Sequence, residues 1–159
     1  MIKLFLFALM LGQFIHQAPK VEIWAEPVPY LESAVMEDYL APVSSYGSGH
    51  RGIDFRVQPG GPIHSPADGL VHFSGLVVDR NVISIRTNTG KIASFEPVCS
   101  KLTRGESVSR GEIIGHHCVA SEAYEYHCEN CVHASARDEY GYLSPMHMFG
   151  QLSPSELLS

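Results

Sequence analysis

Short apolar runs separated by turn residues dominate the chain from Gly52 onward. The clearest alternation is NVISIRT, residues 81–87, where Ile83, Ile85 and Thr87 share one face of an extended strand. Similar runs cover residues 52–57, 69–78, 91–98, 111–119 and 131–140. No window has the apolar spacing of a long amphipathic helix, and no internal repeat occurs. The pattern predicts an all-β domain with a compact core, built as an antiparallel β-sheet or sandwich.

The chain before this pattern is different in character. A lysine at position 3 precedes an apolar segment from Leu4 to Leu11, which is shorter than the ~20 residues of a membrane span. Residues 1–25 therefore indicate a secretory signal peptide, cut after Ala25, or an uncleaved N-terminal anchor. Residues 26–45 contain three prolines and part of a glycine and serine cluster, which predict an extended linker with room for a short helix. We expect the domain over residues 46–151 and a tail over 152–159.

Composition narrows the possible partners and the location. The 159 residues suffice for one domain with a core, and the net charge is −6 without any polybasic run. Because phosphate backbones are bound by clustered lysine and arginine, nucleic acid is not an expected partner. The leader predicts a secreted or cell-envelope protein that meets the membrane only through an uncleaved leader. Export would permit disulfides among the four cysteines, Cys99, Cys118, Cys128 and Cys131.

Two short segments carry candidate metal ligands. His50 and Asp54 are four residues apart, about 13 Å on an extended strand, so they converge only if His50 lies in a turn. Nearby glycines, at positions 47, 49 and 52, supply backbone freedom for such a turn. In CVHASA, Cys131 and His133 point to the same face of a strand. Imidazole and carboxylate are good Zn²⁺ ligands.

Taken in order, these segments resemble the lysostaphin-type, or LytM-like, zinc endopeptidases that cut peptidoglycan. HRGIDF is similar to the family's H-x-x-x-D, and GGPIHSPADGLVHFSG to its strand, ADG turn and next strand. SVSRGEIIG is similar to V-x-x-G-x-x-I-G, CVHASA stands where the family has H-x-H, and YLSPM is similar to the closing Leu-x-Pro. The resemblance implies a LytM-like fold in which His50, Asp54 and His133 bind Zn²⁺ beside a water. It also implies peptidoglycan stem or cross-link peptides as substrates.

Two acid–base positions of the family are changed here. Cys131 replaces the first histidine of H-x-H, and Pro97, in FEPV, replaces the histidine of Y-x-H-L. This pair of changes resembles a divergent, actinobacterial-type branch, and it implies either weak hydrolysis or an inactive peptidoglycan-binding or regulatory module. Strand parity predicts that Glu96 points away from the site unless Pro97 introduces a bulge. His127 is the first candidate for a replacement base, and His116 and His117 are further candidates. Ala134 stands where that branch has a tryptophan, which implies a smaller groove wall.

The role of Cys131 has three alternatives. It forms a disulfide with Cys128 or Cys118, or it is a fourth Zn²⁺ ligand that closes the site, or it joins a zinc knuckle. The knuckle would use all three of these cysteines with His116 or His127. A different possibility for the whole chain is an unrelated β domain with a structural metal or disulfide. That possibility predicts that His50 and Asp54 lie far from His133.

Overall fold

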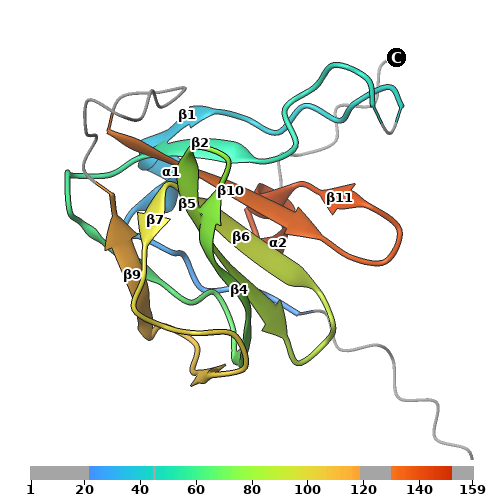
Figure 1. Cartoon of the computed structure of the whole chain (residues 1–159). Coiled ribbons are helices and arrows are strands. Elements are labelled where there is room, and N and C mark those ends of the chain that lie inside the picture. Colours follow the sequence, from blue (N-terminus) through green and yellow to red (C-terminus); the bar gives the residue numbers. More distant parts are fainter. Residues whose placement is uncertain (1–21, 45, 119–129, 152–159) are drawn as a thin grey trace, which may run out of the picture.

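The computed structural model describes residues 22–44, 46–118 and 130–151, which form two antiparallel sheets (Figure 1). The larger sheet has the strand order β1-β2-β10-β6-β5-β4-β8, and β11 also pairs with β10. The smaller sheet has the order β3-β9-β7. The strands are β1 Val35–Glu37, β2 Ile53–Arg56, β3 Pro62–His64, β4 Gly69–Val77, β5 Arg80–Thr87, β6 Ile92–Glu96, β7 Val98–Cys99, β8 Ser107–Val108, β9 Ile113–His117, β10 Cys131–Arg137 and β11 Tyr142–Leu143. The predicted all-β, antiparallel fold is confirmed.

The core lies against one face of the larger sheet, and the alternation along β5 shows why. Ile83 and Ile85 are fully buried, whereas Arg86 between Ile85 and Thr87 is exposed. Phe95 on β6 is paired in register with Ile83 and joins the same core. Each such side chain contributes roughly 1.5–3 kcal/mol when removed from water. The opposite, outer face of the sheet is therefore left for polar groups.

The segment before β2 packs against the domain, which corrects the extended linker expected over residues 26–45. Leu31, in helix α1 Leu31–Ala34, is fully buried, and β1 then pairs with β2. Trp24 is 2% exposed and lies edge-on to Phe149, which follows helix α2 Pro145–Met148. The last residues of the expected leader thus contribute to the core, while most of that leader lies outside the described residues. Neither described helix is long enough to cross a membrane.

Candidate metal centre

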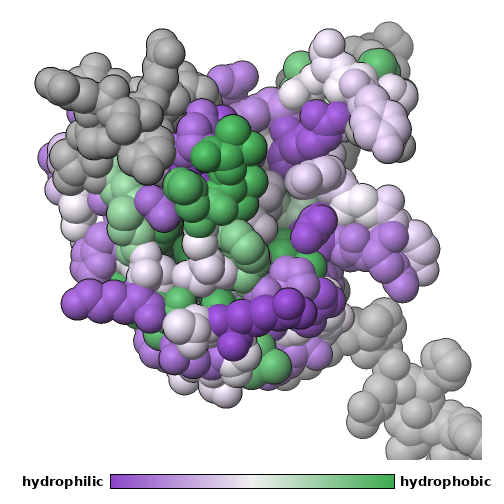
Figure 2. Space-filling view, in the orientation of Figure 1, coloured by the Kyte–Doolittle hydropathy of each residue, from purple (hydrophilic) through white to green (hydrophobic). Residues whose placement is uncertain are grey.

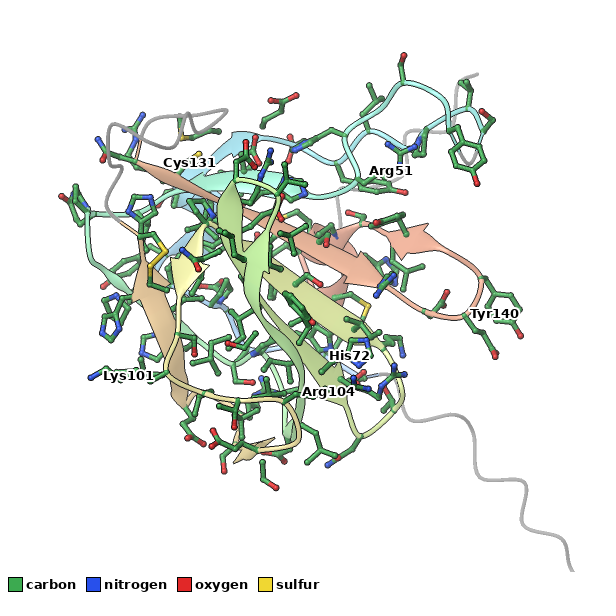
Figure 3. All side chains as sticks on the ribbon, viewed as in Figure 1. Arg51, His72, Lys101, Arg104, Cys131 and Tyr140 are labelled. Atoms are coloured by element: carbon green, nitrogen blue, oxygen red, sulfur yellow. A yellow bond between two sulfur atoms is a disulfide. The ribbon has the colours of Figure 1, made fainter. Side chains whose placement is uncertain are left out.

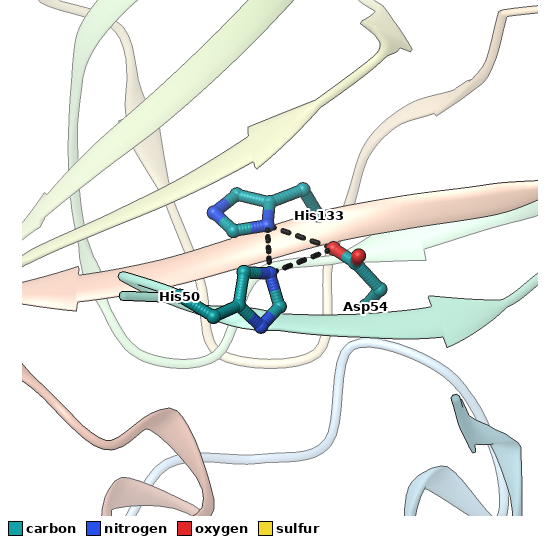
Figure 4. Close-up of side chains that lie close together, drawn as sticks. All are labelled: His50, Asp54 and His133. Atoms are coloured by element: carbon teal, nitrogen blue, oxygen red, sulfur yellow. Dashed lines mark hydrogen bonds and ion pairs between the residues drawn. The ribbon is translucent and has the colours of Figure 1, made fainter. Parts of the chain in front are cut away.

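Three side chains from two segments that are distant in sequence meet above β2 and β10 (Figure 4). His133 Nδ1 lies 2.8 Å from Asp54 Oδ1, and His50 Nε2 lies 3.3 Å from the same oxygen. The two imidazole nitrogens are 3.1 Å apart. Within residues 22–44, 46–118 and 130–151, this is the one group of three metal-ligating side chains whose ligand atoms all lie within 4.8 Å of one another. The proximity excludes the hypothesis of an unrelated domain in which these residues are apart.

Strand pairing and a backbone bridge position the three groups. Asp54 on β2 and His133 on β10 are partners in the ladder, so their side chains leave the sheet on the same face. His50 precedes β2 and is held by two backbone hydrogen bonds with Leu40, each 2.9 Å long. Its Nδ1 lies 2.8 Å from the Asp38 carbonyl oxygen, which only accepts, so Nδ1 carries the proton. The Nε2 lone pair is consequently directed at the cluster, as in metal-binding histidines.

Gly52 allows this close approach by lacking a side chain. A Cβ atom at this position would lie 2.2 Å from the Ala134 carbonyl oxygen and 2.6 Å from the His133 ring. Its φ is not in the left-handed region, and the same is true of Gly47 and Gly49. The glycines therefore supply space for packing, and the unusual backbone freedom expected from the sequence is not what the turn uses.

The chemistry of the cluster fits a divalent cation. Asp54 is 3% exposed, and the two histidine side chains are each 17% exposed. Burying a carboxylate costs free energy unless the carboxylate is paired. The Asp54 carboxylate lies beside two imidazole nitrogens, and both are atoms that can bind a metal. Two imidazole nitrogens and one carboxylate oxygen on one side of an accessible site are a ligand set of catalytic zinc centres. His50, Asp54 and His133 are thus the residues that could hold Zn²⁺.

The cysteines do not take part in this centre. Cys131 is disulfide-bonded and 1% exposed, and a disulfide sulfur offers no thiolate to a metal. Cys99 and Cys118 are bonded to each other, which rules out the Cys118–Cys131 disulfide. The fourth-ligand and zinc-knuckle alternatives are therefore wrong. Cys128 and His127, the candidate base, lie outside the described residues.

Glu96 lies on the face that carries the cluster, contrary to the parity argument. The ladder between β6 and β10 pairs Glu96 with His133, and partners in an antiparallel ladder have side chains on the same face. Its Oε1 accepts a hydrogen bond of 3.5 Å from Arg80 Nη1. The sequence prediction placed the Glu96 side chain on the opposite face from the position of its neighbour Pro97. The direction of this side chain is instead decided by the register of β6 with β10, where Glu96 pairs with a residue 37 positions later.

The remaining expectations about neighbouring side chains are decided by burial. Ala134 is 2% exposed and paired with Phe95, so it faces the core and forms no groove wall.

The other described histidines considered as bases do not join the cluster. His117 is buried, and burial lowers its pKa; His72 also has a lowered pKa, through burial and then the positive charges of three arginines.

The order of these elements matches a known family. Residues 48–145, which include all three cluster residues, match the model of peptidase family M23. The chain belongs to peptidase family M23. Lysostaphin-type enzymes share this M23 fold, so the resemblance seen in the sequence is confirmed at the level of the family.

The chain also resembles mycobacterial proteins in sequence. The chain is 34% identical over 82 residues to Rv2891 of Mycobacterium tuberculosis and to Mb2915 of Mycobacterium bovis, both uncharacterized proteins. That match covers 52% of this chain and 33% of each relative, so this M23 chain aligns with about a third of their length.

Two solved structures show the M23 fold. The catalytic domain of lysostaphin from Staphylococcus simulans is 18% identical, with a TM-score of 0.61 over 79% of this chain and 99% of that domain. A chain of the SpoIIQ–SpoIIIAH pore forming complex is 16% identical, with a TM-score of 0.65 over 82% of this chain and 93% of that one. At these identities the likeness concerns the fold alone.

Proposed function

We propose that the protein is a zinc-dependent endopeptidase that hydrolyses stem or cross-link peptides of peptidoglycan outside the cytoplasm. The observation that carries the proposal is the convergence of His50, Asp54 and His133 within 4.8 Å in a chain of family M23. Zn²⁺ held by these residues would supply Lewis-acid polarisation of a peptide carbonyl and a lowered pKa for water. Lysostaphin, which is described as an antimicrobial peptidase, has the same fold.

Proton transfer requires a group on the same face, and Glu96 is the residue that we assign to it. The positions of the family histidines are taken by Pro97 and by the disulfide-bonded Cys131, neither of which accepts a proton. Glu96 lies beside His133 across the ladder, where paired Cα atoms are about 5 Å apart. Arg80 contacts only Oε1, so Oε2 is available for a proton on its way to the leaving amine.

The disulfides support a location outside the cytoplasm. All cysteines among the described residues, Cys99, Cys118 and Cys131, are disulfide-bonded. Such bonds persist in oxidising compartments and are rare in reducing ones. This agrees with the secretory leader predicted over residues 1–25.

A second candidate function is a non-catalytic module that binds or regulates at the peptidoglycan. The replacement of both acid–base histidines by Pro97 and a disulfide-bonded Cys131 favours it. It predicts binding to cell-wall sacculi without release of peptides.

Incubation of the full, zinc-loaded chain with purified sacculi tests the proposal. We expect new amino termini to be released, and His133→Ala to abolish both the bound zinc and the release. His147→Ala, which removes an exposed histidine on α2, is the matched control and should retain both. Binding of zinc and of sacculi without any release would support the second function. Failure of the wild-type chain to bind zinc contradicts the hydrolase.

A further inference from the structure

The outer face of the larger sheet continues from the metal centre to a second polar site. Along β10, residues 133, 135 and 137 point to this face, and their partners on β6 are residues 96, 94 and 92. On β5, Ser84 and Arg86 pair with residues 94 and 92. At one end of this face, β10 carries His133 and β6 carries Glu96. All three strands have a serine in the middle, and β5 and β10 carry arginines at the other end.

This second end, which we call the basic end, consists of Arg86, Arg104, Arg137 and His72. Arg86 and Arg137 line a pocket of about 510 Å³ together with Ile92 and Tyr140. Arg86 Nη2 donates to His72 Nδ1 at 3.3 Å. Figure 3 places Arg104 close to His72, and Figure 2 shows a strongly hydrophilic band in that part of the same view.

Positive charge at the basic end is not neutralised by ion pairs within the described part of the chain. None of Arg86, Arg104 and Arg137 forms a salt bridge with a carboxylate there, although the whole chain has a net charge of −6. Lys91, which also lines the pocket, is paired with Glu22 at 3.6 Å.

Two acidic residues, Asp138 and Glu139, line the pocket as well. The Asp138 carboxylate is engaged by the backbone N–H groups of Tyr140 and Gly141, at 2.8 and 3.1 Å. Burial and then the positive charges of Arg86, Arg104 and Arg137 lower the pKa of His72. Positive charges near one another repel, and a bound anion would offset that repulsion.

The distance between the two sites suits a peptide. His133 and Arg137 are four residues apart on one strand, which corresponds to about 13 Å. A substrate lying extended along the strand advances at the same rise per residue, so a group three or four residues from the cut reaches the arginines. Ser94 and Ser135, which are paired in the ladder between the two sites, have small side chains that offer hydroxyl groups.

We propose that the basic end is a subsite for a carboxylate of the peptide substrate, three or four residues from the bond cut at the metal centre. The location of the cut rests on the proposed function, whereas the preference for a carboxylate rests on the arginines. A guanidinium binds a carboxylate through two parallel hydrogen bonds, which makes arginine suited to this recognition. The subsite therefore selects acidic peptides over the same peptides with amidated side chains.

Calorimetric titration of the full, zinc-loaded chain with two stem pentapeptides tests this subsite. One peptide has free carboxylates, and the other has the same sequence with its glutamate and C-terminal carboxylates amidated. We expect the free peptide to bind about tenfold more tightly or better, as charge-assisted hydrogen bonds do. Arg137→Gln and Arg86→Gln, tested separately, should each reduce that ratio towards one. Lys101→Gln, an exposed lysine that lies well apart from the basic end in Figure 3, should leave it unchanged.

The results of these titrations test the carboxylate subsite independently of the proposed hydrolase activity. His133→Ala removes the metal centre, so a free-peptide preference that survives in this variant supports the subsite even if no peptide bond is cut. Equal affinity of the wild-type chain for both peptides overturns the subsite, and so does a ratio that both arginine variants leave intact. Thermal melting of each variant identifies a loss of folding, and a folded variant with an unchanged ratio counts against the proposal.

Discussion

Glu96 and His133 are partners across the ladder between β6 and β10, and Asp54 is the partner of His133 on its other side. One histidine thus has a carboxylate-bearing neighbour on each adjacent strand. The two carboxylates differ in their surroundings, because Asp54 contacts both histidines of the cluster, whereas Glu96 contacts Arg80. This difference is what the proposed roles require, with Asp54 as a metal ligand and Glu96 as the group that transfers a proton.

Glu96→Gln is expected to lower kcat by about 10²–10⁴-fold, the usual contribution of an acid–base group. The glutamine keeps the shape and the contact with Arg80 but cannot take up a proton. Zinc content should stay at the wild-type level, because Glu96 is not one of the three clustered ligands. Peptide release from sacculi and metal analysis are the two measurements. Glu32→Gln, an exposed glutamate on α1, is the control, and an undiminished kcat in Glu96→Gln would exclude the assigned role.

Gly52→Ala is expected to weaken zinc binding and to destabilise the fold by about 1–3 kcal/mol, as overpacking does. The new methyl group would collide with the Ala134 carbonyl and the His133 ring, so β2 and β10 must separate. Zinc affinity and urea unfolding measure the two effects. The contrasting variant is Gly90→Ala, where φ is +89° and the space is open. It should cost about 1–2 kcal/mol in stability while leaving zinc affinity unchanged. Equal zinc affinities for wild type and Gly52→Ala would contradict the packing argument.

Replacing Cys99 and Cys118 together by serine is expected to lower the free energy of unfolding by about 3 kcal/mol. The bond joins β7 to the residue after β9 and closes a loop between positions 19 apart. Its loss frees the unfolded chain but leaves the ligands on β2 and β10 in place, so zinc stoichiometry should not change. Urea unfolding and metal analysis of the double variant report on each. A loss of zinc in the folded variant would show that the small sheet supports the centre, against this expectation.

Stability is expected to decrease as the pH is lowered below about 6.5, the ordinary histidine pKa. Burial holds the pKa of His117 below that value, so the unfolded chain binds more protons between the two pKa values. The stability present above pH 6.5 is then lost as the pH falls through the lowered pKa. Melting temperatures between pH 8 and pH 5 should decline less steeply in His117→Asn than in the wild type. His147→Asn, at an exposed position, should follow the wild-type slope; coincident slopes for all three proteins would refute the assignment.

Local sequence patterns determined the class of the fold and the identity of the clustered residues. The alternation in residues 81–87 depends only on which side chains are apolar, and β5 buries Ile83 and Ile85 as predicted. His50, Asp54 and His133 were identified from residue type, spacing and the order of motifs, which are all properties of the linear chain. The role of these three as zinc ligands stays a prediction until metal analysis.

Tertiary structure decided what depends on pairing between distant strands. The direction of Glu96 follows from its register with His133, and the core position of Ala134 follows from its pairing with Phe95. The Cys99–Cys118 bond depends on β7 lying beside β9, and the basic end depends on Arg86 and Arg137 meeting across β6. A shift of one residue in any of these registers would turn every side chain of a strand to the other face. No local pattern encodes that choice, because it is made by the packing of the whole sheet.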